Sequence, residues 1–259
     1  MTGATGVDGA GPRTGRAGYR ETLARLTAAQ KGTARSAPAY SRFVNRRIGR
    51  LLAAWAYRRG LSPNAVTALS AVCTFAGVAV LALAPPAVGT GVAVCLLLVV
   101  GYALDSADGQ VARLTGTGSS AGEWLDHMVD ATKVVALPLA LLVGLHRSAA
   151  VPEPWLLVPI ASAVVGSVQF FAMMLTEQLR RAHGVVSTTR ADGRRSWLRS
   201  VLVVPTDYGV LCLSFLLYGS PAVFVAVLAL LTAGTAAFLA LALPKWFRDV
   251  RALGGPVPT

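Results

Sequence analysis

The chain has 259 residues, of which 54% are hydrophobic and only 14% are charged, and its formal net charge is +12. This composition excludes an ordinary soluble enzyme and predicts a protein that lies in a lipid bilayer. We interpret the positive charge as a signal of membrane topology and of attraction to anionic membrane lipids, and we expect no nucleic-acid partner.

The first segment, residues 1–36, is rich in Gly, Ala, Thr and Arg. It contains no apolar stretch of the kind that a signal peptide needs, and it has too few large hydrophobic residues to form a core. We therefore predict a disordered cytoplasmic tail, within which residues 19–30 form a short helix.

Residues 37–61 are predicted to form an amphipathic helix. Apolar side chains recur at helical spacing, and most arginines occupy the other faces. The apolar positions are Val44, Ile48, Leu51, Leu52 and Trp55. Such a helix lies in the plane of the lipid headgroups; the alternative is a helix that packs this apolar face on the protein itself. Gly60 ends it, and Pro63 starts the next helix, where proline is favoured.

Six segments are predicted to cross the membrane, which makes the fold an all-α integral membrane protein. Four of them carry no charge and are long enough to span a hydrocarbon core of about 30 Å. These are residues 65–83, 87–104, 154–176 and 221–243. Two further segments, residues 122–145 and 201–218, contain ionisable residues. The predicted membrane domain covers residues 62–247, and a cytoplasmic tail covers residues 248–259.

Positive charge alternates between the predicted connections. The 60 residues before the first crossing hold twelve Lys and Arg residues, and the connection after the fourth crossing is also rich in arginine. The connections at residues 84–86 and 219–220 hold no charged residue. Because cytoplasmic loops are enriched in Lys and Arg, we predict that both termini face the cytoplasm and that the protein lies in the cell (plasma) membrane.

Four aspartates follow helical spacing on the second and third crossings. If the second crossing continues as helix past residue 104, Asp105 and Asp108 lie on one face, and Asp126 and Asp130 share a face of the third crossing. Unpaired charges are costly at the edge of apolar segments. The short connection at residues 115–121 allows the two pairs to point at a common centre on the cytoplasmic side, which would suit two divalent cations.

Oxygen ligands in this number favour Mg2+ or Mn2+ over zinc. Two such ions hold a pyrophosphate and stabilise the charge that develops during in-line displacement, so the site is typical of phosphoryl transfer. Gly109, Ala112 and Gly122 are small enough to let a base or a phosphate approach the helix backbone, and Arg113 is placed to neutralise a phosphate oxygen.

This segment resembles the signature of the CDP-alcohol phosphotransferase (CDP-alcohol phosphatidyltransferase) family. It fits the pattern D-x2-D-G-x2-A-R-x8-G-x3-D-x3-D without a mismatch, and Pro63, Asn64 and Thr67 resemble the start of the family's first crossing. The matched residues are Asp105, Asp108, Gly109, Ala112, Arg113, Gly122, Asp126 and Asp130. The family's six crossings and its juxtamembrane helix also agree with the predicted elements.

The resemblance implies transfer of a substituted phosphate from a CDP-linked alcohol to an acceptor hydroxyl, with release of CMP, in phospholipid biosynthesis. It implies that two divalent cations, Mg2+ or Mn2+, are bound by the aspartates, and that Asp130 also takes the proton from the acceptor. Asp108, Gly109, Ala112, Arg113 and Gly122 would contact the CDP moiety. At least one substrate would be a lipid, and the family implies a homodimer. The residues implied as metal ligands are Asp105, Asp108, Asp126 and Asp130.

Other charged residues have less specific interpretations. We expect Lys133 either to pair with Asp130 one turn earlier or to reach the headgroup region, and His127 to form a local hydrogen bond rather than to bind a metal. Asp207 and Glu177 are left unassigned. A group of arginines is interpreted either as a contact for an acceptor's phosphate or as a topology signal, and it comprises Arg190, Arg194, Arg195 and Arg199.

Two other functions are compatible with the sequence. The intramembrane aspartates are also what a divalent-cation carrier needs, but the apolar halves of the second and third crossings offer few polar groups toward the far leaflet. A catalytically silent scaffold is the other alternative. Neither the donor nor the acceptor alcohol is specified: diacylglycerol-type lipids, inositol phosphates, glycerol phosphate and serine all remain open.

Overall fold

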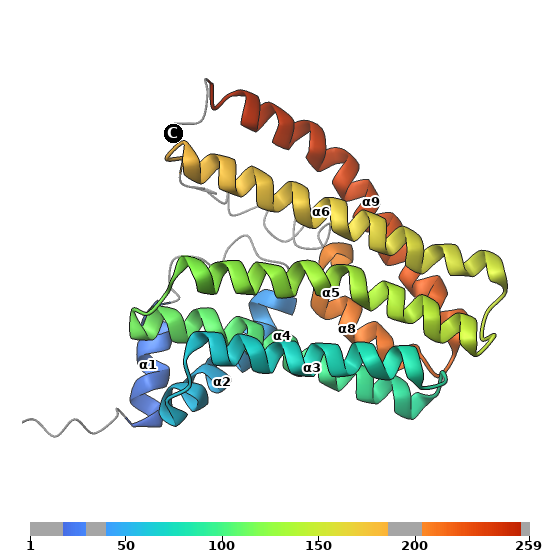
Figure 1. Ribbon diagram of the computed structural model, residues 1–259, viewed down its shortest axis with the longest axis horizontal. Coiled ribbons are helices and arrows are strands. Elements are labelled where there is room, and N and C mark those ends of the chain that lie inside the picture. The colour runs from blue at the N-terminus through green and yellow to red at the C-terminus, as the bar shows by residue number, and fades with distance from the viewer. Residues whose placement is uncertain (1–17, 30–39, 186–203, 255–259) are drawn as a thin grey trace, which may run out of the picture.

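The computed structural model describes residues 18–29, 40–185 and 204–254, and every regular element in these ranges is a helix. Labels follow Figure 1. The elements are α1 (Tyr19–Ala29), η1 (Ser41–Asn45), α2 (Arg46–Arg59), α3 (Pro63–Leu83), α4 (Val88–Thr115), α5 (Ser120–Arg147), η2 (Glu153–Leu156), α6 (Leu157–Ala182), η3 (Val204–Thr206), α8 (Tyr208–Ser214), η4 (Phe215–Leu217) and α9 (Pro221–Arg251).

Five helical segments are long and apolar enough to cross a membrane, namely α3, α4, α5, η2 with α6, and α9. The prediction of an all-helical membrane protein is therefore confirmed, and the charged third crossing is a helix of full length. The predicted crossing at residues 201–218 differs. Its described part holds a short apolar helix over Tyr208–Leu217, which at 1.5 Å per residue covers roughly 15 Å, and residues 201–203 lie outside the described ranges.

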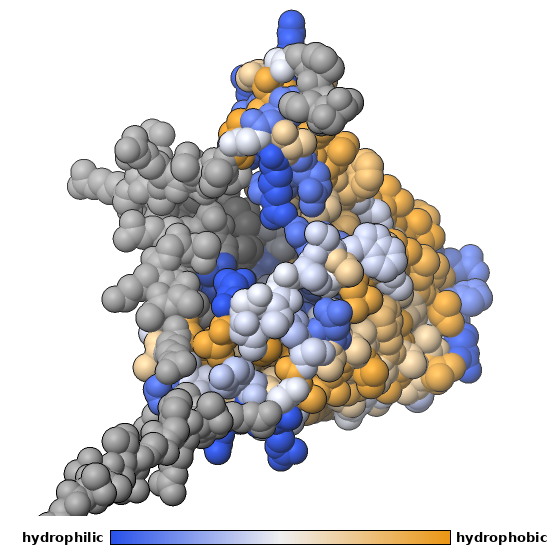
Figure 2. Space-filling model, turned by 60° about the vertical axis from the view of Figure 1, so that its left-hand side comes forward, coloured by the Kyte–Doolittle hydropathy of each residue, from blue (hydrophilic) through white to orange (hydrophobic). Residues whose placement is uncertain are grey.

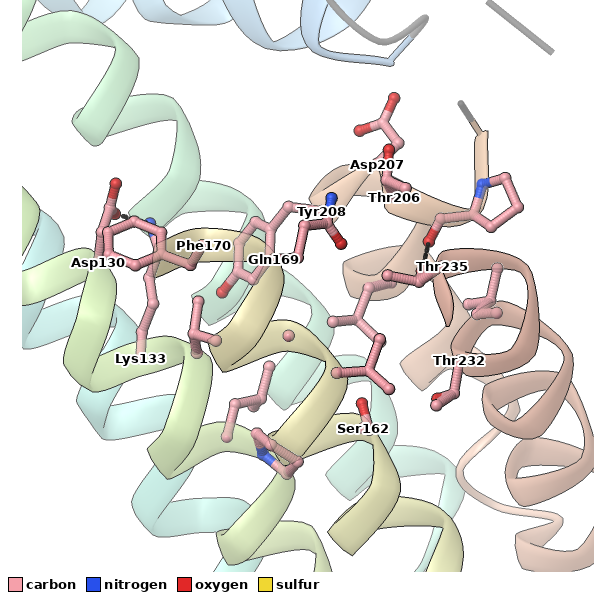
Figure 3. Close-up of a pocket in the computed structure, with 18 of the residues that line it drawn as sticks. Asp130, Lys133, Ser162, Gln169, Phe170, Thr206, Asp207, Tyr208, Thr232 and Thr235 are labelled. Carbon is pink, nitrogen blue, oxygen red and sulfur yellow. Dashed lines mark hydrogen bonds and ion pairs between the residues drawn. The ribbon is translucent and has the colours of Figure 1, made fainter. Parts of the chain in front are cut away.

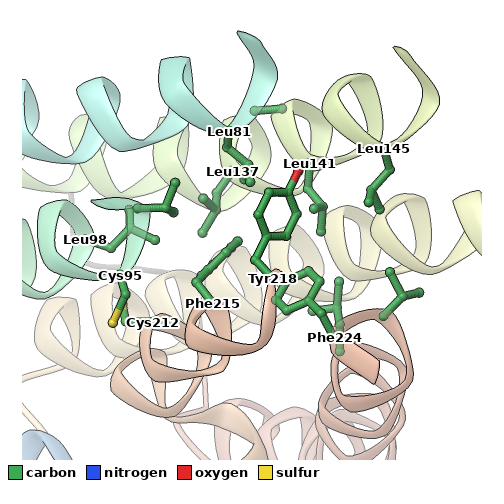
Figure 4. Packing of buried hydrophobic residues seen from close by; sticks show 14 residues of the cluster. Leu81, Cys95, Leu98, Leu137, Leu141, Leu145, Cys212, Phe215, Tyr218 and Phe224 are labelled. Carbon is green, nitrogen blue, oxygen red and sulfur yellow. The ribbon is translucent and has the colours of Figure 1, made fainter. Parts of the chain in front are cut away.

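Helices α4 and α5 both pack on α3, and the three form the centre of the bundle, while α6 and α9 pair with each other and lean away from it at one end (Figure 1). The short α8 and η4 lie between these two groups. The main core is centred on Phe215 of η4, Tyr218 directly after it and Phe224 of α9. These aromatic side chains pack on Leu81 and Leu141 (Figure 4). The core thus joins the last third of the chain to the helices that carry the aspartates.

A close helix contact fixes the ends of α3 and α5. A Cβ atom on Gly144 of α5 would collide with the main-chain oxygen of Leu81 of α3, so glycine allows the two backbones to meet. The Arg147 guanidinium donates to the main-chain oxygen of Ala82 at 3.1 Å beside this contact. The close backbone contact and this hydrogen bond hold α3 and α5 together at the end of the bundle that lies away from the aspartates.

The amphipathic helix is present as η1 and α2, and most of its large apolar residues do not pack on the protein; Leu52, which is partly buried against Leu26 and its neighbours, is an exception. Leu51 is 49% exposed and Trp55 is 37% exposed. The face that packs on α4 consists instead of small residues, including Gly49, Ala53 and Ala56. An apolar stripe that faces outward, flanked by arginines, is what a helix at a membrane surface presents. This arrangement favours the interfacial interpretation over the alternative of a protein-packed apolar face.

Part of the predicted disordered tail is ordered. Residues 19–29 form α1, as the predicted short helix requires, and Leu26 of this helix is buried against α2 and α4. The Tyr19 hydroxyl also donates to the Leu51 main-chain oxygen at 3.3 Å. At the other end of the chain, α9 continues to Arg251, so the predicted C-terminal tail begins as helix.

Hydrophobic residues form a band across the side of the molecule, and hydrophilic residues gather at both of its ends (Figure 2). The outer positions of α6 and α9 contribute to the band with exposed side chains such as Phe171 and Leu241. Exposed apolar surface of this extent is expected where lipid tails, rather than water, surround a protein.

Candidate active site around four aspartates

The local sequence explains why the four aspartates meet. Helix α4 continues past the apolar segment to Thr115 and is ended by Gly116, whose φ of 66° lies in the left-handed region that glycine favours. The Ser119 side chain then caps α5 by accepting from the Gly122 main-chain N–H at 3.1 Å. The tight turn between these caps reverses the chain and returns α5 along α4, with its first turns opposite the last turns of α4.

Lys133 joins the aspartates of the two helices. Its ammonium lies 2.5 Å from Asp130 Oδ1 on its own helix (Figure 3). The ammonium also lies 3.6 Å from Asp105 Oδ1 on α4. The expected pairing of Lys133 with Asp130 is thus confirmed, and the contact to Asp105 is an addition. Asp126 lies within electrostatic range of both Asp105 and Asp108. The sequence-predicted carboxylates therefore form one cluster.

Asp108 is held by a residue from α3. The Thr67 hydroxyl donates to Asp108 Oδ2 at 2.6 Å, and the Gly109 main-chain N–H donates to Asp108 Oδ1. Thr67 is buried, as is Asp108. Sequence analysis noted Thr67 only as part of the start of the first crossing and gave it no role. Its contact fixes the direction in which one carboxylate of the cluster points.

A cavity of about 520 Å³ opens between α3, α4 and α5 beside the cluster, and we call it the polar cavity. Its wall carries Asp108 and Asp126 together with every other signature residue at which contact with CDP is expected. Gly122 keeps this wall open, because a Cβ atom there would lie 2.9 Å from Asn64 Oδ1. The lining signature residues are Asp108, Gly109, Ala112, Arg113, Gly122 and Asp126.

A second cavity, of about 370 Å³, lies on the other side of the cluster between α5, α6, α8 and α9, and we call it the apolar cavity (Figure 3). Asp105, Asp130 and Lys133 lie at one end of it. The rest of its wall is mainly apolar, with Asp207 and a few neutral polar groups such as Gln169 and Thr232. Leu137, Phe170, Met173, Met174, Leu228 and Leu231 are among its apolar residues. The four aspartates thus separate a polar cavity from an apolar one.

The side chains fit a divalent cation. Asp126, His127 and Asp130 each offer a ligand atom, and these atoms all lie within 4.8 Å of one another. Asp126 Oδ1 is buried and has no hydrogen-bond partner among the described residues. Because buried oxygens normally have a partner, this oxygen is available to bind a cation. Carboxylate oxygens favour Mg2+ or Mn2+.

His127 has a larger role in this geometry than its spacing suggested. Its Nε2 lies 3.6 Å from Glu123 Oε1, which agrees with the expected local contact. However, the buried Nδ1 has no partner among the described residues, and the ring belongs to the group of ligand atoms around Asp126 and Asp130. Helical spacing alone did not indicate this, because His127 is one residue away from the aspartate face.

The remaining predicted residues have different outcomes. Glu177 accepts from Arg181 at 3.3 Å on the surface of α6. Asp207 caps α8 through the Gly209 main-chain N–H at 3.0 Å and also accepts from the Tyr40 main-chain N–H at 2.8 Å, so its contacts are structural. The proposed acceptor contacts Arg190, Arg194, Arg195 and Arg199 lie outside the described residues.

Comparison with known proteins identifies the arrangement. A search of curated proteins finds no match to the chain. The sequence model of the family described as CDP-alcohol phosphatidyltransferase matches residues 61–246. The match covers α3 to most of α9 and therefore includes the aspartate cluster and both cavities. With a match over well more than half of its length, the chain belongs to the CDP-alcohol phosphatidyltransferase family.

Proposed function

We propose that the chain transfers a substituted phosphate from a CDP-alcohol bound in the polar cavity to the hydroxyl of an acceptor, and that the aspartate cluster is the catalytic site. Family membership implies CDP-alcohol phosphotransfer with release of CMP in phospholipid synthesis. The observation that supports the site is its position, because the four aspartates lie where the polar and apolar cavities approach each other.

Each signature residue has a role in this proposal. Asp105, Asp108, Asp126 and Asp130 would hold two divalent cations, Mg2+ or Mn2+. Such ions would neutralise the pyrophosphate and stabilise the charge that develops on the transferred phosphate. Thr67 keeps Asp108 in place through its 2.6 Å hydrogen bond. Gly109, Ala112, Arg113 and Gly122 would line the nucleotide, with the Arg113 guanidinium facing phosphate oxygens.

Proton transfer is assigned to Asp130. Its carboxylate lines the apolar cavity, where it would accept the proton of the acceptor hydroxyl. The acceptor oxygen forms a new bond to the β-phosphorus of the donor as the bond to the CMP oxygen breaks, and CMP leaves from the polar cavity. Asp130 serves as a general base only if it is within hydrogen-bond reach of that hydroxyl.

The apolar cavity suits the lipid part of a substrate. Its volume of about 370 Å³ is within the usual range for a small-molecule site, and its Met and Phe side chains can adapt to flexible chains. We propose that at least one of the two substrates is a lipid that reaches the cluster through this cavity. Membrane lipids would also contact the exposed stripe of α2.

The arginine group is proposed to bind an anionic part of the acceptor. In the sequence, α6 precedes the arginine group and η3 follows it, and Pro205 and Thr206 of η3 line the apolar cavity. The group comprises Arg190, Arg194, Arg195 and Arg199. If the acceptor carries a phosphate, replacing Arg194 and Arg195 by Gln raises the KM for that acceptor and leaves the KM for the donor unchanged. An acceptor without a phosphate is insensitive to both changes.

A sixth crossing is proposed for the segment between α6 and α9. Arg181 pairs with Glu123 at 2.5 Å, which puts the end of α6 beside the start of α5. Gly219 lies against Val88 at the opposite end of α4. The intervening chain therefore passes from one end of the bundle to the other. With six crossings and the arginine-rich end in the cytoplasm, both termini and the site face the cytoplasm of a plasma-membrane protein.

The remaining parts of the organisation are proposals as well. We propose cytoplasmic ends at residues 1–36 and 248–259, an interfacial helix over residues 37–61, and a catalytic membrane domain over residues 62–247. We also propose a homodimer that forms through membrane helices. Support for the homodimer is the slight burial of α6, where only 11% of its most apolar window is covered by the rest of the chain. Cross-linking in native membranes tests it.

The test of the proposed function is release of CMP. Purified full-length protein in lipid vesicles is offered CDP-alcohols and acceptor alcohols in pairs, with Mg2+ or Mn2+. We expect CMP release with one pair, and its loss on chelation and in Asp126→Asn. Folded protein that binds metal but releases no CMP with any pair would argue for a catalytically silent scaffold. Metal flux across sealed vesicles without nucleotide would argue for the cation carrier.

A further inference from the structure

We propose that Lys133 is a built-in cation that competes with the divalent metal for Asp105 and Asp130, and so sets the metal concentration at which the enzyme works. This inference rests on the proposed function, since it assigns those two carboxylates to the metal. Lys133 lies outside the eight signature positions, and in this inference it is a positioning residue that acts through the carboxylates.

The contacts of Lys133 are made to oxygens that the metal needs. Its ammonium lies 2.5 Å from Asp130 Oδ1 and 3.6 Å from Asp105 Oδ1. The side chain is only 10% exposed, so water cannot replace these carboxylates as its partners. A buried ammonium is stable only while it keeps such acidic neighbours. A divalent cation that binds either carboxylate oxygen must therefore share that oxygen with Lys133 or displace the ammonium from it.

The Lys133 ammonium has a further partner, the aromatic ring of Tyr208. Lys133 Nζ lies 5.1 Å from the centroid of the Tyr208 ring, at a distance typical of a cation–π interaction. Tyr208 lines the apolar cavity beside Lys133 (Figure 3). When a metal takes up Asp105 and Asp130, the flexible side chain can retain the ring face as its partner. The exchange then requires no new pocket.

The charge balance gives the direction of the effect. Four carboxylates and one ammonium give the cluster a formal charge of −3, whereas removal of the ammonium makes it −4. A unit charge within a few ångströms changes the proton affinity of a carboxylate by about 1 to 3 pKa units, which is about tenfold or more. Removal of the ammonium should therefore also raise the affinity of the carboxylates for a divalent cation, because the same electrostatic potential acts on a proton and on a metal ion.

The experiment measures metal binding directly, with Mn2+ titrated into the purified full-length chain in the absence of nucleotide. Calorimetry gives the midpoint, and thermal unfolding with and without Mn2+ gives an independent reading. We expect Lys133→Met to lower the Mn2+ midpoint by about tenfold or more and to increase the stabilisation by Mn2+. Lys133→Arg keeps the charge, so its midpoint should equal or exceed that of the wild type.

Arg181→Met is the matched control. It removes a cation that pairs with Glu123 and Glu177 at the surface of the same end of the bundle, and it should leave the Mn2+ midpoint unchanged. If Lys133→Met does not fold, Lys133→Gln replaces it as the neutral variant. An unchanged or higher midpoint in the neutral variant overturns the proposal, as does a lower midpoint in Lys133→Arg.

Release of CMP separates this inference from the proposed function. If the wild type releases CMP but the neutral Lys133 variant binds Mn2+ with the same midpoint as the wild type, the inference on Lys133 fails and the function stands. If the midpoint shifts as expected but no donor and acceptor pair yields CMP, the competition at the cluster stands and the proposed function fails.

Discussion

The hydrogen bond from Thr67 to Asp108 offers a sharp test of the site, because it can be removed with almost no change in shape. Thr67→Val replaces the hydroxyl by a methyl group. The shorter of the two lost contacts is the 2.6 Å bond to Asp108 Oδ2, and the other is a 3.2 Å contact to the Pro63 main-chain oxygen on the same helix. Both residues are buried, with Thr67 4% and Asp108 7% exposed.

A hydrogen bond to a charged group is worth about 1.5 to 3 kcal/mol. If binding of the metal and the donor requires a fixed orientation of the Asp108 carboxylate, loss of this hydrogen bond raises the free energy of the transition state by that amount. It corresponds to a fall of about 10- to 150-fold in kcat/KM for CMP release, at about 1.4 kcal/mol per factor of ten. Thr67→Ser keeps the hydroxyl and should recover most of the activity.

The matched control is Ser70→Ala, one turn further along α3. Ser70 is also buried, and its hydroxyl donates to the main-chain oxygen of Gly101 at 2.8 Å. We expect this variant to lose about 0.5 to 1.5 kcal/mol of stability while its kcat/KM stays near that of the wild type. Equal activity in Thr67→Val and Ser70→Ala would refute the assignment of Thr67 to the site.

Three further changes test other parts of the account. Asp126→Asn should lower CMP release by at least about 100-fold and abolish its dependence on Mn2+, without loss of folded protein; an active variant would remove Asp126 from the metal site. Asp207→Ala removes the cap of α8 and the partner of the Tyr40 main chain, and should cost about 1 to 2 kcal/mol of stability in thermal unfolding with micelles. Phe224→Ala opens the main core, where Phe224 is fully buried, and should cost about 3 to 5 kcal/mol; a smaller cost would mean that the core collapses around the site.

Helical periodicity made much of the cluster predictable. Asp105 and Asp108 on one helix and Asp126 and Asp130 on the next share faces because side chains three and four residues apart lie on the same side. The family signature gave the same residues. Neither source gave the contact between Asp105 and Lys133, because a contact between two helices depends on their register, which spacing within each helix does not determine.

The fold was predictable where a segment was uniformly apolar and less so elsewhere. Hydropathy identified α3, α4, α6 and α9, but it did not show that α8 is short. For α2, the large apolar residues suggested a face that packs on either lipid or protein. The structure buries small residues such as Ala53 instead, because close approach to α4 requires small side chains. The apolar cavity was not predictable, since its lining comes from segments spread over the sequence from α4 to α9.

The central claim is that the aspartates of α4 and α5 hold a divalent cation against the phosphates of a CDP-alcohol. Electron paramagnetic resonance of Mn2+ bound to the purified protein, recorded with CDP, tests it most directly. We expect hyperfine coupling between Mn2+ and the phosphorus nuclei of CDP, and loss of that signal in Asp108→Asn and in Asp126→Asn. Bound Mn2+ without phosphorus coupling, or a signal that both variants retain, would show that the aspartates do not hold the cation against the phosphates.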